Sequence, residues 1–400
     1  MRRLGKALQP VFVPALAILT AFIVGSVFIL VTDIENLSRL GTDPIGAIGG
    51  AVNTILLAYN SLIVGAIGDP ARFVTAFESG SPRDMAAAIR PLTETLVAAS
   101  PLIFTGLAVA VSFRTGVFNI GVEGQFVLGA FGATAAAIAL RDQPAPLILV
   151  VATVMGMLTG AVWGFIPGFL KARTGAHEVI TTIMLNYVAA QIILFGLRGD
   201  FLRAEGSSQP ISKVLDFVRV PPLIDLPAIR LHAGFILALI MAVVVSWFLF
   251  RTTKGFELRA AGFNLTAARY AGMSAGGSIM LAMLLSGGLA GLGGTMEVLG
   301  TVTQMSNDIS SGYGFNAIAL ALLAGNRPLG IVAAALLFGA LRTGGSLMQV
   351  KTGIPLDLLF FIQALVIMFV AAPGLVRSMW QLDRFRRKSP DAAGTEGAAA

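Results

Sequence analysis

The chain of 400 residues is 56% hydrophobic and only 12% charged, whereas soluble proteins average about 25% charged residues. This composition excludes a soluble globular domain and indicates an integral membrane protein. The chain has no cysteine, which excludes disulfides and cysteine-based metal sites. The formal net charge of +7 does not indicate a nucleic-acid partner, because the basic residues gather beside apolar segments, as membrane orientation signals do.

The apolar runs predict an all-α polytopic membrane protein with about ten transmembrane helices, some of them short or broken. The first run follows Arg2, Arg3 and Lys6. It is too long for a signal peptide, so we interpret it as a retained span. The predicted spans are residues 11–31, 92–113, 117–140, 146–170, 179–197, 233–250, 274–299, 313–325, 329–348 and 356–372.

The basic residues predict that both termini face the cytoplasm. With ten spans, more than half of the 28 Lys and Arg residues fall in inside segments, as the positive-inside rule requires. The predicted parts are a cytoplasmic N-terminus (1–10), a transmembrane domain (11–372) and a cytoplasmic tail (373–400). An eleventh span at 45–68 would place one basic terminus outside, so we expect segment 32–91 to be extracytoplasmic or re-entrant.

The stretch Arg-Thr-Gly-Val-Phe-Asn-Ile-Gly-Val-Glu-Gly-Gln at 114–125 places Asn119, Glu123 and Gln125 in an otherwise apolar sequence. Ionisable groups at membrane depth usually face a protein interior or a wet path, because exposure to lipid costs a few kcal/mol. The stretch also contains three glycines, which weaken a helix locally. The alternative is that Glu123 lies near a helix end and snorkels to the interface.

Two later segments carry further polar groups. Asn186 lies on a polar face of the predicted span 179–197, where it serves either interhelical hydrogen bonding or a solute path. Gly-Tyr-Gly-Phe-Asn at 312–316 echoes Gly-Val-Phe-Asn at 116–119. Glycine-interrupted segments in corresponding halves indicate a central site in transporters. The predicted path residues are Asn119, Glu123, Gln125, Asn186 and Asn316, which would suit a neutral, hydroxyl-rich solute with a flat base.

Glycines also predict where helices pack closely. Gly156, Gly160, Gly164 and Gly168 recur every four residues, and Gly287, Gly291 and Gly294 form a similar stripe. Such stripes allow two backbones to approach. The two histidines, His177 and His232, stand apart near the ends of apolar runs. We expect them at the membrane interface, and neither predicts a metal site.

Segment 251–274 differs from the other inside loops. Residues 256–262 predict a short helix that begins near Glu257 and is closed by a C′ glycine, Gly262. Asn264 can cap a second helix, which would end at Gly272. Such a helix pair is either a rigid knob for a cytoplasmic partner or a compact solvated loop.

Four strings together resemble the inner-membrane permeases of bacterial ABC importers. They are Asn-Ile-Gly-Val-Glu-Gly-Gln at 119–125, Ile-Thr-Thr-Ile-Met-Leu-Asn-Tyr at 180–187, Gly-Phe-Asn-Leu-Thr-Ala-Ala-Arg-Tyr-Ala-Gly at 262–272 and Gly-Tyr-Gly-Phe-Asn-Ala-Ile-Ala at 312–319. The resemblance covers about residues 61–372. It is nearest to the nucleoside and simple-sugar branch of the branched-chain amino acid/ribose permease family.

The resemblance implies a transport subunit of a bacterial inner membrane with no enzymatic activity and no cofactor. Its implied partners are a cytoplasmic ABC ATPase, a second homologous permease, an extracytoplasmic substrate-binding protein and membrane lipid. The chain lacks a Gly-x-x-x-x-Gly-Lys-Ser/Thr loop, so ATP hydrolysis is expected in the ATPase. The residues implied to couple to that ATPase are Glu257, Leu258, Arg259, Ala260, Ala261, Gly262, Asn264, Tyr270 and Gly272.

Other functions remain open at this point. Within the permease class, the solute could be a ribose-type sugar or a branched-chain amino acid. An ion-coupled secondary transporter would need carboxylates in its spans, for which Glu123, Glu297 and Asp357 are candidates. A membrane enzyme is disfavoured, because no catalytic set of acidic, histidine and nucleophilic residues clusters in the sequence.

Overall fold

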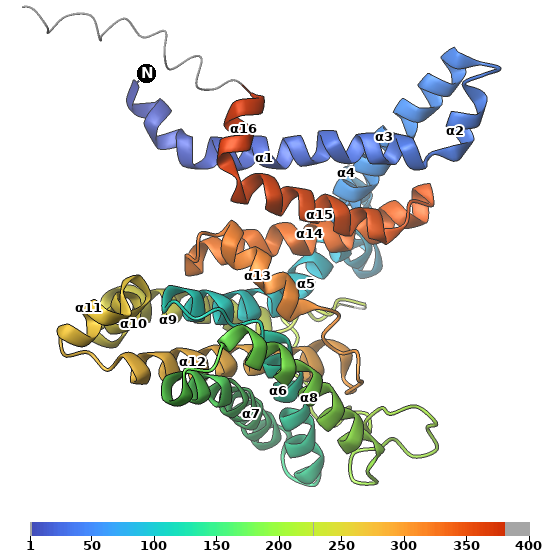
Figure 1. Cartoon of the computed structure of the whole chain (residues 1–400). Coiled ribbons are helices and arrows are strands. Elements are labelled where there is room, and N and C mark those ends of the chain that lie inside the picture. Colours follow the sequence, from blue (N-terminus) through green and yellow to red (C-terminus); the bar gives the residue numbers. More distant parts are fainter. Residues whose placement is uncertain (1, 227, 381–400) are drawn as a thin grey trace, which may run out of the picture. The chain divides into compact units, whose positions relative to one another are not determined.

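The computed structural model describes residues 2–226 and 228–380, and the regular secondary structure in these ranges is helical (Figure 1). Three isolated β-bridges occur outside the helices. The chain forms two compact units, residues 1–60 with 348–400 and residues 61–347. The second unit contains all the predicted path and coupling residues.

Among the described residues, nine helices are long and apolar enough to span a membrane, or ten if one bent pair is a single span. This confirms the predicted all-helical membrane protein with about ten spans. The nine are α1 (Arg2–Thr32), α3 (Pro44–Ile67), α5 (Pro82–Arg114), α6 (Val122–Ala139), α7 (Ala145–Thr174), α8 (Glu178–Arg198), α9 (Gly234–Arg251), α12 (Ala275–Met296) with its π-helical continuation η1 (Glu297–Val302), and α14 (Pro328–Thr352).

Two segments differ from the predicted set of spans. Helix α3 is long and apolar enough to cross, although we expected residues 45–68 to be re-entrant or surface-lying. Helix α13 (Tyr313–Leu323) has 11 residues, which rise only about 16 Å against a hydrocarbon core of about 30 Å. Helix α13 is therefore too short to span, and the orientation with both termini inside stays a prediction.

The segment expected to lie outside or re-enter, residues 32–91, is mostly helical. Asp33 caps α2 (Ile34–Arg39) by accepting from the amide of Asn36 at 3.2 Å. Asp69 caps α4 (Pro70–Ser79) by accepting from Ala71 N at 3.0 Å, and the left-handed Gly80 ends that helix. Helix α5 then starts at Pro82, ten residues before the predicted span, because proline is favoured in a first helical turn.

In the first unit, α1 packs against α15 (Leu356–Ala371) and α16 (Pro373–Met379). Trp380 Nε1 donates to Thr20 Oγ1 at 3.0 Å, and Tyr59 and Ser26 share a hydroxyl–hydroxyl bond of 3.0 Å. The predicted cytoplasmic tail 373–400 therefore begins with α16, which is bent by 90° from α15. The basic residues of that tail from Arg384 onward lie outside the described residues.

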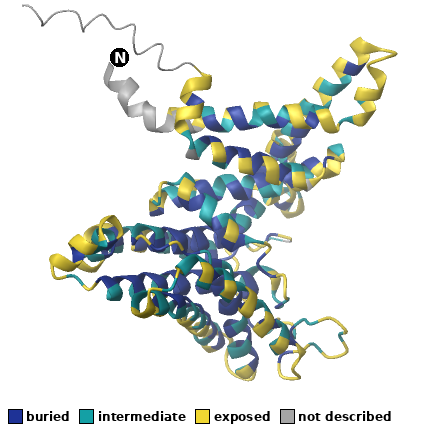
Figure 2. Ribbon diagram, viewed as in Figure 1, coloured by how far each residue is buried: buried dark blue, intermediate teal, exposed yellow. Residues whose placement is uncertain are grey.

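In the second unit, α12 is the central helix and packs against α5, α6 and α7. Most of its residues are buried (Figure 2). The predicted glycine stripes of α7 and α12 meet here. A Cβ added to Gly160 would lie 2.8 Å from Gly291 Cα and would collide with the carbonyl of Gly287. Because no side chain fits between the two backbones, the glycines set the distance between the helices. The predicted packing role of the stripes is confirmed.

Backbone hydrogen bonds tie the long loop 199–233 to the residues that follow α12. The bonds run from Ser212 N to Met305 O at 2.9 Å, from Leu215 N to Thr303 O at 2.9 Å and from Val220 N to Leu299 O at 3.1 Å. This loop lies at one end of the unit, and helices α10 (Thr253–Phe263) and α11 (Leu265–Tyr270) lie at the other (Figure 1).

His232, which we expected at the interface, is only 3% exposed, whereas His177 is exposed. The Nδ1 atom of His232 accepts from Gly234 N at 3.1 Å, so Nε2 carries the proton and faces Thr301 Oγ1 at 3.2 Å. Burial lowers the pKa of His232 to about 4. The imidazole is therefore neutral at physiological pH, and it links the first residue of α9 to η1 through these two hydrogen bonds.

Protein stability should depend on pH through His232. The unfolded chain binds a proton on this histidine below about pH 6.5, whereas the folded chain does so only near pH 4. The contribution of His232 to the free energy of unfolding is fully present above pH 6.5. It falls by about 3 kcal/mol as the pH drops toward 4. Thermal unfolding in detergent should show a steeper loss of stability over this range for wild type than for His232→Asn. His177→Asn is the matched control, and equal slopes for all three proteins would contradict the assignment.

Candidate functional site

The polar stretch 114–125 forms a turn between α5 and α6, which we call the α5–α6 turn (residues 115–121). We predicted a span from residue 117, but α6 begins at Val122. The reason is local. Gly116 adopts a left-handed φ of +73°, and the Asn119 side chain accepts from Gly121 N at 2.9 Å. Both features hold the backbone in a turn instead of a helix.

Asn119 and Gln125 lie in one fully buried hydrogen-bond network with Ser286 of α12. Asn119 Nδ2 donates to Gln125 Oε1 at 3.1 Å and to Ser286 Oγ at 2.9 Å. Ser286 Oγ in turn donates to Ala108 O of α5 at 2.7 Å. The network joins α5, α6 and α12, so its amides are satisfied by protein groups and brace the turn.

Asn186 fixes α8 to the same turn. Its Nδ2 donates to Ile120 O at 3.0 Å, and its Oδ1 accepts from Gly124 N at 2.9 Å. The side chain therefore satisfies a free carbonyl of the turn and a free amide in the first turn of α6. Asn186 therefore binds the same turn that contains Asn119. This agrees with the interhelical hydrogen-bond alternative for the polar face of α8.

Glu123 bonds the start of α13, the helix that contains Asn316. Glu123 Oε2 accepts from the backbone amide of Gly314 at 2.8 Å, in the first turn of α13. A carboxylate at a helix N-terminus satisfies a free N–H group and the positive end of the helix dipole. Asn316 follows Gly314 by two residues and is half-buried. Of the five predicted path residues, Glu123, Asn186 and Asn316 keep some exposure.

The helix pair in segment 251–274 is present, with boundaries that correct one prediction. Helix α10 runs from Thr253 to Phe263, so Gly262 lies inside it and is not a C′ glycine, and Glu257 lies after the first turn. The helix starts earlier because Thr252 caps it, accepting from Gly255 N at 3.0 Å. Glu257 instead pairs with Lys254 at 2.9 Å.

The second helix agrees with its prediction. Asn264 Oδ1 accepts from the amides of Thr266 and Ala267, both at 3.0 Å, which caps α11. Gly272 follows the helix with a left-handed φ of +78°. Because both ends of α11 are specified by local residue chemistry, the sequence located it correctly.

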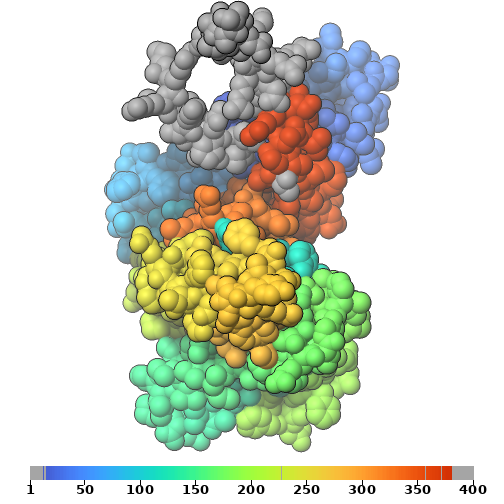
Figure 3. Space-filling model, turned by 60° about the vertical axis from the view of Figure 1, so that its left-hand side comes forward, coloured from blue at the N-terminus to red at the C-terminus, as the bar shows by residue number. Residues whose placement is uncertain are grey.

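The helix pair presents one face to the rest of the chain and another to its surroundings. Leu258 and Ala261 are buried against the chain itself. Phe263 and Tyr270 are 87% and 90% exposed, and Figure 3 turns the helix pair, in yellow, toward the viewer. Of the nine residues implied to couple to an ATPase, Leu258 and Ala261 thus face inward.

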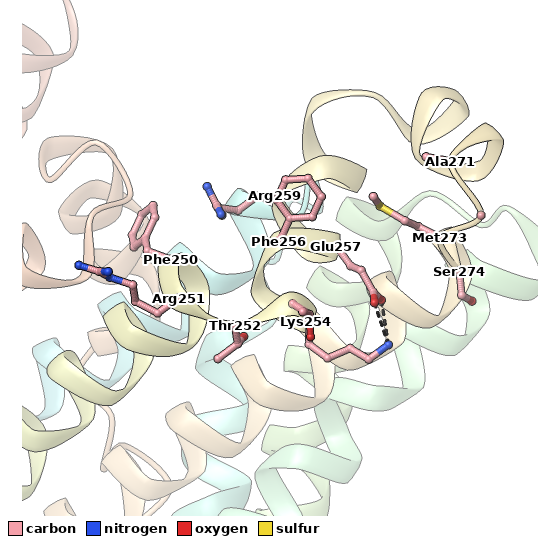
Figure 4. Close-up of a pocket in the computed structure, with 12 residues that line it drawn as sticks. Phe250, Arg251, Thr252, Lys254, Phe256, Glu257, Arg259, Ala271, Met273 and Ser274 are labelled. Carbon is pink, nitrogen blue, oxygen red and sulfur yellow. Dashed lines mark hydrogen bonds and ion pairs between the residues drawn. The ribbon is translucent and has the colours of Figure 1, made fainter.

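A hollow of about 780 Å³ separates the start of α10 from the end of α11. Figure 4 shows the ion pair of Lys254 and Glu257 on one wall, with Met273 and Ser274 opposite. Arg259 lies beside the Phe256 ring at 5.9 Å and over the Phe250 ring at 5.2 Å. The hollow is open and combines cationic, anionic and aromatic groups, which suits a protein surface better than a small apolar ligand.

The sequence analysis named Glu297 as a candidate but missed two arginines, Arg342 and Arg230. Arg342 of α14 lies 4.8 Å from the centroid of the Tyr313 ring at the start of α13. Glu297 is buried in η1, and Arg230 pairs with Glu94 of α5, with one N–O distance of 3.1 Å. The available signal was a charge in the middle of an apolar run, which is rare without function. No cluster of metal-ligating residues occurs in the described part of the chain.

Comparison with known proteins adds to this geometry. A family model described as "Branched-chain amino acid transport system / permease component" matches residues 92–371. The guanosine ABC transporter permease protein NupP of Bacillus subtilis is 43% identical over 71% of this chain and 82% of its own length. The nucleoside ABC transporter permease protein NupB of Lactococcus lactis is 33% identical over 93% of both chains. The glucose ABC transporter permease protein TsgB13 of Haloferax volcanii is 36% identical over 75% of this chain and 81% of its own length.

No solved structure matches the chain. The family match covers more than half of the chain, and it includes the α5–α6 turn, the helix pair α10–α11 and α13. The resemblance that the four sequence strings suggested is therefore confirmed. The chain belongs to the family of permease components of branched-chain amino acid transport systems.

Proposed function

We propose that the chain forms the membrane path of an ATP-driven importer for nucleosides, with ATP hydrolysed by a separate ABC ATPase. Two of the three relatives described above are named as guanosine and nucleoside permeases. The third is named as a glucose permease, which makes simple sugars the second candidate class. The family supports an importer with an ATPase and a binding protein as partners, in a bacterial-type membrane.

One observation carries the coupling part of this proposal. The backbone of Gly262 in α10 lies against the backbone of the α5–α6 turn, so that a Cβ added to Gly116 would lie 3.2 Å from Gly262 Cα. The helix pair thus contacts the segment that holds the polar path residues. An exposed aromatic helix pair in contact with the path fits a transporter driven by a cytoplasmic partner better than an ion-coupled secondary transporter.

The path residues have two roles in the proposal. Asn119 and Gln125, buried and satisfied by protein groups, shape the path from behind, and Asn186 holds α8 to them. Glu123, which bonds the first turn of α13, and Asn316, which lies within α13, keep some exposure and are placed nearer to the path in this proposal. Amide and hydroxyl groups recognise the hydroxyls and base of a neutral solute without a charged clamp.

The exposed aromatic residues of the helix pair should dock the ATPase. Phe263→Ala combined with Tyr270→Ala should lower the amount of ATPase that co-purifies by about tenfold or more, because central aromatic side chains dominate binding energy at interfaces. Phe195→Ala on α8, where Phe195 is 82% exposed, is the matched control and should retain the ATPase. Full retention by the double variant would contradict docking at this surface.

The solute is tested by uptake into vesicles that contain the chain with its partner proteins. Labelled nucleosides should enter in an ATP-dependent way, and unlabelled nucleosides should compete. Competition by glucose or ribose but not by nucleosides would assign the sugar class instead. Competition by leucine or valine alone, or uptake driven by an ion gradient without ATP, would overturn the proposal.

A further inference from the structure

We propose that Arg114 and Glu123 clamp α13 at its two ends and join it to the helix pair α10–α11, so that α13 follows the helix pair during the transport cycle. This inference rests on the proposed function, because it assigns the part of the membrane domain that an ATPase would move. It concerns positioning residues, since neither side chain needs to touch the solute.

Arg114 holds the carboxyl end of α13. Its Nε donates to Asn326 O at 3.0 Å, and its Nη2 donates to Gly325 O at 3.0 Å. Gly325 and Asn326 both adopt left-handed backbone conformations, with φ of +58° and +55°. The two carbonyls belong to the turn that follows α13, whose own last carbonyls already accept from the backbone amides of residues 324–326. A guanidinium that donates to two successive carbonyls fixes this turn, and its positive charge lies near the negative end of the helix dipole.

Glu123 holds the amino end of the same helix. Its carboxylate accepts from Gly314 N at 2.8 Å, where free amides and the positive end of the dipole favour an anion. The contact is close, because a Cβ added to Gly314 would lie 2.5 Å from Glu123 Cα. Arg114 therefore lies at the negative end of the helix dipole and Glu123 at the positive end, although both residues come from one short stretch of chain around the α5–α6 turn.

The same stretch carries the contact with α10. A Cβ on Gly262 would collide with Arg114 O and would lie 3.0 Å from Gly116 N. The Arg114 guanidinium also lies 5.6 Å from the centroid of the Phe250 ring, at the end of α9 where the chain leads into α10. Arg114 thus contacts α13 through its side chain and the helix pair through its backbone.

These contacts define a mechanical connection. Contact between two backbones leaves no flexible side chain to absorb a displacement, and close-packed groups transmit strain. Helix α13 is too short to span, packs against α5 and α6, and begins at Tyr313, next to the Gly314 amide that Glu123 binds. A displacement of α10 toward the membrane would therefore shift α13 at both ends instead of tilting it about one end.

The test uses the complete transporter and measures solute uptake per ATP hydrolysed. Arg114→Ala should lower this ratio by about tenfold or more, because it removes both charge-assisted hydrogen bonds to the turn after α13, while ATPase retention stays unchanged. Arg114→Lys should recover part of the loss, because an ammonium can still donate to one carbonyl. Arg327→Ala removes an exposed charge from the same end of α13 and is the matched control with a normal ratio.

A distance measurement distinguishes transmission of movement from α10 to α13 from a purely structural role of Arg114. The native chain has no cysteine, so spin labels can be attached through Thr253→Cys on α10 and Leu322→Cys on α13, both at exposed positions. In wild type the distance between the labels should stay constant when ATP is added. In Arg114→Ala it should change or broaden with ATP, because α10 then moves without α13.

Three results would overturn the inference. They are a normal uptake ratio in Arg114→Ala, a constant label distance in that variant with ATP, or parallel loss of ATPase retention and uptake. The last would show that Arg114 only maintains the fold of the helix pair. The distance measurement needs no solute, so a wild-type protein that imports neither nucleosides nor sugars would contradict the proposed function and leave the clamp to be judged on the label distances.

Discussion

Gly262→Ala should strongly lower ATP-driven uptake while leaving the protein in the membrane. The added Cβ would collide with Arg114 O and lie 3.0 Å from Gly116 N. Both are backbone atoms, which cannot move aside as the tip of a side chain can. Alanine favours a helix over glycine by about 1 kcal/mol, so α10 should stay folded and be displaced outward from the α5–α6 turn.

Uptake into vesicles and co-purification of the ATPase measure the two consequences of this change. We expect uptake to fall by at least about tenfold, which corresponds to about 1.4 kcal/mol. Gly276→Ala at the start of α12 is the matched control, because its Cβ would meet Ala172 Cβ at an ordinary 3.6 Å. Normal uptake by Gly262→Ala would show that the close contact with the turn has no part in transport.

The second large effect concerns the crossing of α7 and α12. Gly291→Leu should prevent folding, because Gly291 lies against the backbone of Gly156 and its added Cβ would be 3.1 Å from Gly160 Cα. In lipid, helix association depends on close packing, since no hydrophobic effect drives helices together. Gly291→Ala, a smaller change, should lower stability by about 1–3 kcal/mol, as overpacking usually does.

The amount of monodisperse protein recovered in detergent and its thermal midpoint test this prediction. Gly288→Ala is an informative control, because Gly288 lies three residues earlier on the same helix. Its added Cβ would meet Met157 Cγ at 3.5 Å and Ala161 Cβ at 3.7 Å, which are ordinary contacts. Equal stability of the two alanine variants would mean that the α7–α12 crossing tolerates a wider separation.

The sequence by itself determined the features that depend on local or periodic signals. Composition and apolar runs predicted an all-helical membrane protein, and four-residue spacing predicted the glycine stripe of α7. Asn264 and Gly272 predicted the start and end of α11, because a cap and a left-handed glycine act within a few residues. The four strings around the turn, α8, the helix pair and α13 indicated the family.

Only the tertiary structure decided which groups meet. Asn119 bonds Ser286, 167 residues away, Glu123 bonds Gly314, 191 residues away, and Arg114 bonds Gly325, 211 residues away. The sequence identified Gly262 as important but for the wrong reason, since what demands glycine there is the backbone of Arg114 and not a turn. Burial of His232 was missed for the same cause. Such contacts depend on how distant helices pack, and the chemistry of one residue and its neighbours does not specify which distant atom will face it.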